Sequence, residues 1–160
     1  MIMRSLLLTV AAAAVAAACS DNSGPDMAPV SASVSVAPAP NAANVSRGDT
    51  IRMWFDMPVD SASCLNRFTL HLADSTGEAV PGRMMFGGGY RQMMFVPDSL
   101  MRAGTGYFAH LRDSVMMRET MHDDGMGGQM GGGRMMTMDG IPAGATRMRD
   151  GMGWSFTTGN

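Results

Sequence analysis

The sequence has no lysine, and its 12 basic residues are all arginines set against 14 acidic residues. The formal net charge is −2 and becomes about −3 once Arg4, the only charge of an expected leader, is removed. Phosphate binding needs a clustered basic surface, so this weakly acidic balance argues against a nucleic-acid partner. Catalytic motifs are missing too: no nucleophile elbow or triad context occurs, and the glycine-rich run 125–133 lacks a phosphate-loop Lys-Ser/Thr. We therefore expect a protein that is not an enzyme.

A run of apolar residues long enough to span a membrane is also missing. The apolar stretch at 6–18 is short and rich in alanine, and it follows Arg4. This pattern is typical of a secretory signal rather than of a membrane span. We expect a signal peptide over residues 1–18.

The residues that close this stretch, Ala16-Ala17-Ala18-Cys19, resemble a bacterial lipobox. The resemblance implies that Cys19 is acylated, becomes the new N-terminus and anchors the protein to a membrane. Ser20-Asp21 carries no clear retention signal, which favours the outer membrane. The alternative is an ordinary secreted protein that is cut near Ala18.

Cysteine is scarce, with only Cys19 and Cys64 in the chain. If Cys19 is acylated, no intramolecular disulfide is available, so the core must be held by burial alone. Residues 19–30 are mainly small and polar and are interpreted as a flexible tether.

The rest of the chain shows short period-two runs that are interrupted by turn residues. Several short strands at such intervals indicate an all-β sandwich or barrel. No stretch sustains helical periodicity. The expected strands centre on residues 34–36, 51–55, 68–72, 93–95, 107–111 and 154–158, with Met84 and Met85 in a further strand.

Three segments resemble the S-layer-type bacterial Ig-like domain (SbsA Ig-like). They are residues 49–60 (DTIRMWFDMPVD), residues 95–107, which are similar to an F-x-P-x-x-x-L-x-x-G-x-x-Y pattern with the leucine one position early, and residues 154–158 (WSFTT). The resemblance covers residues 31–158 and implies one Ig-like antiparallel β-sandwich that acts as a spacer, binding or adhesion unit. It implies that Pro97 ends a strand, that Leu100 packs into the core, that Gly104 forms a tight bend and that Tyr107 forms a tyrosine corner.

The segment from 114 to 153 is longer than a normal connection, and we expect it to form a Met/Gly-rich loop inserted before the last strand. The chain has 20 methionines, several times ordinary usage, and many of them fall in this segment. Thioether sulfur is a soft ligand that selects Cu(I) or Ag(I). The candidate ligands are Met116, Met117, Met121, His122, Met126, Met130, Met135, Met136 and Met138.

A weaker resemblance supports this hypothesis. CopC-like periplasmic copper-resistance proteins are also small Ig-type sandwiches with a methionine-rich loop. Their N-terminal histidine ligand is absent here, because the mature chain is expected to start at Cys19, which argues against a Cu(II) site of that type but not against a thioether Cu(I) site. Three alternatives remain open: an oxidant sink, a hydrophobic contact surface or neutral low-complexity sequence.

The other soft or basic ligands add little to this hypothesis. His71 and His110 lie on the polar phase of their strands, so we expect both to face solvent. If their strands are neighbours, the two rings could approach each other across the sheet. Cys64 is expected to be a buried, inert thiol. No protein partner is predicted.

Overall fold

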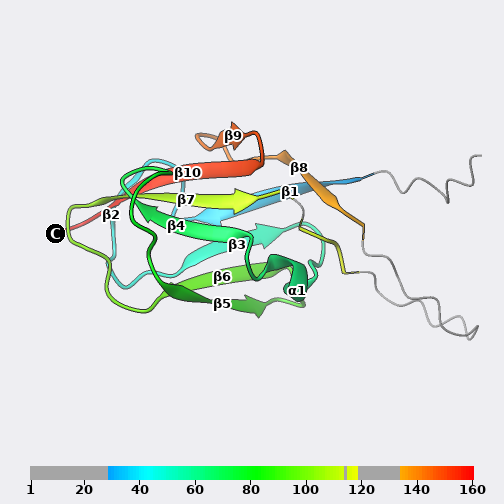
Figure 1. Ribbon diagram of the computed structural model, residues 1–160, viewed down its shortest axis with the longest axis horizontal. Helices are drawn as coiled ribbons and strands as arrows, with labels where there is room; N and C mark the ends of the chain where they lie inside the picture. The colour runs from blue at the N-terminus through cyan, green and yellow to red at the C-terminus, as the bar shows by residue number, and fades with distance from the viewer. Residues whose placement is uncertain (1–28, 114, 119–133) are drawn as a thin grey trace, which may run out of the picture.

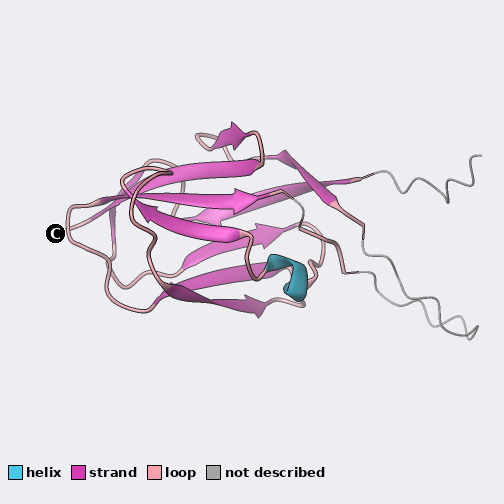
Figure 2. Ribbon diagram, in the orientation of Figure 1, coloured by secondary structure: helices cyan, strands magenta, loops and turns pink. Residues whose placement is uncertain are grey.

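The computed structural model describes residues 29–113, 115–118 and 134–160, which form a two-layer β-sandwich (Figures 1 and 2). One helix of four residues, α1, lies at one end of the sandwich. No helix of the described ranges is long and apolar enough to cross a bilayer. The elements in chain order are β1 (Val30–Ala37), β2 (Ala42–Val45), β3 (Ile51–Phe55), α1 (Ser61–Cys64), β4 (Phe68–Leu72), β5 (Gly82–Gly87), β6 (Gln92–Pro97), β7 (Gly106–Arg112), β8 (Met136–Gly140), β9 (Thr146–Met148) and β10 (Gly151–Thr158).

The first sheet has the strand order β5-β6-β3-β1-β8 and the second β2-β10-β7-β4, with β9 added beside β10. Most pairs are antiparallel, while β1 pairs with β8 and β10 with β2 in parallel. The all-β Ig-like sandwich expected from the sequence is confirmed.

The core lies between the two sheets and is built by the predicted alternation. Ile51, Met53 and Phe55 of β3 are buried on one face, and Trp54 on the other face is 37% exposed. Aromatic rings from both sheets meet in the centre, where Phe68 lies 5.0 Å from Phe95 between ring centroids. Burial of such side chains supplies the main driving force for folding in a domain without a disulfide.

The bend after β6 differs from the expectation at one residue. Leu100 is 66% exposed, so its predicted place in the core is wrong. Met101 is buried there instead, because its backbone bonds with Arg47 turn its side chain inward: Met101 N donates to the Arg47 carbonyl, and the Arg47 Nε donates to the Met101 carbonyl. Gly104 has a φ of +56° and makes the expected bend.

The tyrosine corner is present. The Tyr107 hydroxyl accepts a hydrogen bond of 2.6 Å from the backbone N–H of Arg102, five residues earlier. The Tyr107 ring is 1% exposed and stacks on Phe156 of β10. Tyr107 therefore ties the β6–β7 connection to β7 and to the neighbouring strand β10.

The expectation that residues 114–153 form a single loop is wrong in its second half. Residues 136–140 form β8, which extends the first sheet beside β1, and residues 146–148 form β9. β10 then begins at Gly151, three residues before the expected start at Trp154. Residues 136–140 form a strand because Met136 and Met138, two positions apart, both point into the core.

Candidate functional site

Three chain segments meet at the end of the sandwich that carries α1 and the start of β1 (Figure 1). Residues 115–118 run between the segments 58–60 and 134–136 and bond to both. The Asp60 N–H donates to the Met116 carbonyl, and the Arg118 N–H donates to the Pro58 carbonyl. The Met117 N–H donates to the Arg134 carbonyl at 2.8 Å. Backbone hydrogen bonds therefore hold the chain on both sides of residues 119–133, which contain four of the nine candidate ligands.

Met116 and Met135 face each other in an isolated antiparallel bridge. The bonds beside them run from Met117 N to the Arg134 carbonyl and from Met136 N to the Val115 carbonyl. This pattern makes Met116 and Met135 a non-hydrogen-bonded pair, in which the two Cα atoms lie about 4.5 Å apart and the side chains are closest. Both side chains leave the same face, and Met135 is 53% exposed. Two thioethers are thus placed together at the surface.

The other sequence candidates are distributed differently. Met136 and Met138 are each 1% exposed and belong to the core, so they do not join an exposed ligand set. Met117 is half-buried and packs against the core. Met121, His122, Met126 and Met130 lie outside the described residues, as does Cys19.

Cys64 at the C-terminal end of α1 is fully buried, as expected. Burial raises the pKa of its thiol to about 11, and the Ser63 hydroxyl 3.9 Å away lowers the pKa only in part. A thiolate is the form that binds metal, so at neutral pH this sulfur is inert. Among residues 29–113, 115–118 and 134–160, no group of three His, Cys, Asp or Glu side chains is arranged to hold an ion.

His110 does not face solvent, which corrects the sequence expectation. It is 8% exposed, because the turn between β9 and β10 brings Asp150 over the outer face of the second sheet. Its Nε2 atom lies 3.4 Å from the Asp150 carboxylate and has no hydrogen-bond partner among the described residues. Burial lowers the pKa of His110, and Asp150 opposes that effect. β4 and β7 are neighbours, which meets the condition for an approach of the two rings, but the His71 Nδ1 lies 3.0 Å from the Gly77 carbonyl oxygen.

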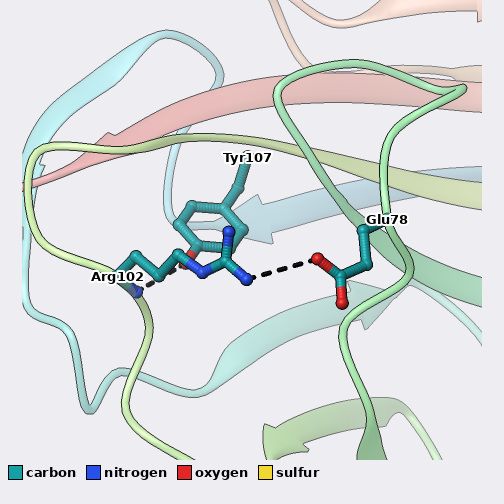
Figure 3. A network of polar contacts seen from close by, with 3 residues as sticks. All are labelled: Glu78, Arg102 and Tyr107. Atoms are coloured by element: carbon teal, nitrogen blue, oxygen red, sulfur yellow. Dashed lines mark hydrogen bonds and ion pairs between the residues drawn. The ribbon is translucent and has the colours of Figure 1, made fainter.

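A pocket of about 230 Å³ lies near the opposite end, between the β4–β5 connection and the β6–β7 connection. Figure 3 shows its polar edge, where the Arg102 guanidinium donates to Glu78 and the Arg102 backbone N–H donates to the Tyr107 hydroxyl. The Arg102–Glu78 ion pair spans 3.2 Å, and both side chains are about two-thirds exposed. Exposed ion pairs contribute little to stability. The remaining wall is largely apolar and includes Leu72, Val80, Pro81, Leu100 and Met101.

Sequence reasoning did not find this pocket. Glu78 and Arg102 are 24 residues apart and follow no motif, and each lies in a connection rather than in a strand. Only the tyrosine corner gave a signal near it, because Tyr107 fixes the backbone of Arg102.

The fold and the sequence together define the class of protein. The bacterial Ig-like domain family model matches residues 14–120, which is more than half of the chain, so the chain belongs to that family. The match includes two of the three segments that suggested the resemblance. The third segment, residues 154–158, lies beyond it and forms most of β10.

Several solved structures are similar. CopC from Methylosinus trichosporium OB3b is 13% identical, over 80% of this chain and 93% of that one, with a TM-score of 0.48. The surface layer protein SbsC, domains 1–6, is 12% identical over 79% of this chain, with a TM-score of 0.45. This chain spans 14% of the length of that SbsC structure. No curated protein matches the sequence.

Proposed function

We propose that this chain is an exported, lipid-anchored module of the bacterial cell envelope that acts by binding or spacing rather than by catalysis. Family membership carries the proposal, because Ig-like domains commonly serve as structural or adhesive units. The leader at 1–18 and the lipobox-like Cys19 supply the export route and the anchor.

The position of β1 fits this arrangement. The chain enters the sandwich at Val30, whose N–H donates to the Met135 carbonyl at 3.1 Å. The ten residues between Cys19 and Val30 let these two residues lie at most about 40 Å apart when the chain is extended. On this proposal the end with Met116 and Met135 lies nearer the membrane, and the pocket edged by Glu78 and Arg102 lies farther from it.

The anchor is tested by metabolic labelling with a clickable fatty acid in the full chain. The wild-type protein should incorporate label and fractionate with outer membranes, whereas Cys19→Ala should lose the label. Cys64→Ala is the matched control and should keep it, since the buried Cys64 thiol is not modified. An unlabelled wild-type protein in the medium would show an ordinary secreted protein.

A second candidate function is binding of Cu(I) or Ag(I), and the Met116–Met135 pair is the observation that favours it. Two soft sulfur donors emerge side by side at the base of the segment that contains Met121, His122, Met126 and Met130. Soft ligands of this kind select Cu(I) or Ag(I) over harder cations. We propose that this pair supplies two ligands and that the segment supplies the rest.

The molecule contains a matched control for this idea. Met85 on β5 and Met94 on β6 also face each other across two strands and are at least partly exposed. Their register differs, because the Asp98 N–H bond to the Pro81 carbonyl places Met85 and Met94 in a hydrogen-bonded pair with Cα atoms about 5.5 Å apart.

The experiment compares two double variants of the full chain in a Cu(I) titration against a competing chelator. Met116→Leu with Met135→Leu should weaken binding about tenfold or more, because two donors are lost. Met85→Leu with Met94→Leu should leave the affinity unchanged. Equal affinity in all three proteins would reject this site, and equal losses in both variants would indicate nonspecific thioether binding.

A further inference from the structure

The free edges of the two sheets are protected, with one exception. Along β4, residues 78–80 of the β4–β5 connection cover the edge through an isolated bridge: the Leu72 N–H donates to the Glu78 carbonyl, and the Val80 N–H donates to the Leu70 carbonyl. Unpaired strand edges are templates for another chain, and natural proteins commonly cover or shorten them.

The outer edge of β8 is protected at both ends. The Met136 N–H donates to the Val115 carbonyl at the start of the strand. Near its end, the Arg147 guanidinium donates to the carbonyls of Met138 and Asp139. β2 and β9 have only four and three residues, and β2 is interrupted by Asn44 with a φ of +57°.

β5 differs from all of these edges. It has six residues, GRMMFG, and pairs only with β6 within the described part of the chain. The Asp98 N–H bond to the Pro81 carbonyl fixes the phase of this pairing, so Arg83, Met85 and Gly87 point their backbone groups toward β6. The N–H and C=O groups of Gly82, Met84 and Phe86 therefore point outward along the free edge.

The side chains of β5 are also incompletely covered. Met84 and Phe86 face the interior, opposite Phe95 and Met93, yet both remain only half-buried. Met85 on the outer face is 46% exposed. A further strand beside β5 would cover apolar surface on both faces of the sheet, in addition to satisfying the outward backbone groups.

We propose that β5 is a pairing surface for a second copy of this chain, with the two β5 strands antiparallel about a two-fold axis at Met84. The outward groups at Gly82, Met84 and Phe86 are spaced symmetrically about Met84, so one edge complements another copy of itself. In this register Met84 opposes Met84 of the second copy, and the small Gly82 opposes the bulky Phe86. Two five-stranded sheets become one sheet of ten strands.

The proposal does not depend on the anchor or on metal binding. It predicts a concentration-dependent dimer of the full chain in a mild detergent, measured by sedimentation velocity. Met84→Pro removes an outward N–H while leaving the bonds to β6 intact, so it should raise the dimer dissociation constant about tenfold or more. Met85→Lys puts a charge on the edge and should weaken the dimer similarly.

The control is Ser35→Lys, which places the same charge on the same sheet face in the central strand β1. It should dimerise like the wild type, and thermal unfolding should show that the variants are folded. A monomeric wild type overturns the proposal. A dimer that tolerates both β5 substitutions overturns it as well.

Discussion

At the residue scale, the bend after β6 shows how neighbouring side chains exchange roles. Met101 is 2% exposed and Leu100 is 66% exposed, so the core residue stands at the leucine position of the family pattern, one residue after the Leu100 that was expected there. Met101→Ala should therefore lower the free energy of unfolding by about 2–4 kcal/mol, because it leaves a cavity in the core. Leu100→Ala should change it by less than about 0.5 kcal/mol. Urea denaturation of both variants checks the assignment, and a larger loss for Leu100→Ala would contradict it.

The same bend shows why the burial of a single residue outside a strand is hard to predict from the sequence. The alternation in β3 correctly placed Ile51, Met53 and Phe55 in the core, because strand geometry fixes the direction of every second side chain. In a bend, direction depends on backbone bonds to distant segments, such as those between Met101 and Arg47. No local period encodes such bonds.

His110 gives the domain a pH-dependent contribution to stability. Burial lowers the pKa of His110 below its ordinary value, so the folded state favours the neutral ring. Stability from this residue is present above the unfolded pKa of about 6.5 and is lost as the pH falls through the lower folded pKa. Asp150 opposes the shift, so Asp150→Asn should make the loss on acidification larger. Thermal midpoints between about pH 7 and pH 5 test this, with His110→Gln expected to flatten the profile.

At the element scale, the start of β10 depends on a glycine. Gly151 has a φ of +149°, and a Cβ built there would lie 2.1 Å from the Leu111 carbonyl oxygen on β7. This φ disfavours any residue with a side chain, and the close pairing of β10 with β7 leaves no room for one. Gly151→Ala should therefore destabilise the domain by about 3 kcal/mol.

A matched substitution separates the steric effect from the effect of positive φ. Gly89 has a φ of +64°, but nothing lies within 4 Å of a Cβ built there. Gly89→Ala should cost only about 1 kcal/mol, the ordinary penalty for a left-handed residue. Guanidinium denaturation of the two variants gives the comparison, and equal losses would show that β10 can shift away from β7.

The sequence missed β2, β8 and β9, of which β2 and β8 pair with strands far away in the chain and β9 pairs with its neighbour β10. β8 pairs in parallel with β1, about 100 residues earlier in the chain, and β9 has only three residues. Among many methionines and glycines, Met136 and Met138 looked like further members of an exposed loop, although their spacing of two fits a strand. The many methionines and glycines of this segment therefore concealed a period-two pattern, which is recognised only from the pairing of β8 with β1.

At the scale of the whole molecule, the described residues pair with each other on both sides of residues 119–133 and complete the sandwich without them. Met117 N–H bonds the Arg134 carbonyl at 2.8 Å, so the two ends of the segment are already joined by paired backbone. The pocket edged by Glu78 and Arg102 lies near the other end of the sandwich and shares no residue with this closure. The core and the proposed metal ligands are therefore separable.

Replacing residues 119–133 with a glycine-containing turn of about four residues tests this separation. Because loop closure depends only weakly on length, the thermal midpoint should change by no more than about 4 °C. Cu(I) affinity should fall by more than in the Met116→Leu and Met135→Leu variant, since Met121, His122, Met126 and Met130 are lost as well. A folded deletion variant with unchanged affinity would reject the metal hypothesis, whereas an unfolded one would show that the segment belongs to the fold. The dimer proposed at β5 should persist in the deletion variant, because β5 and β8 lie at opposite edges of the first sheet.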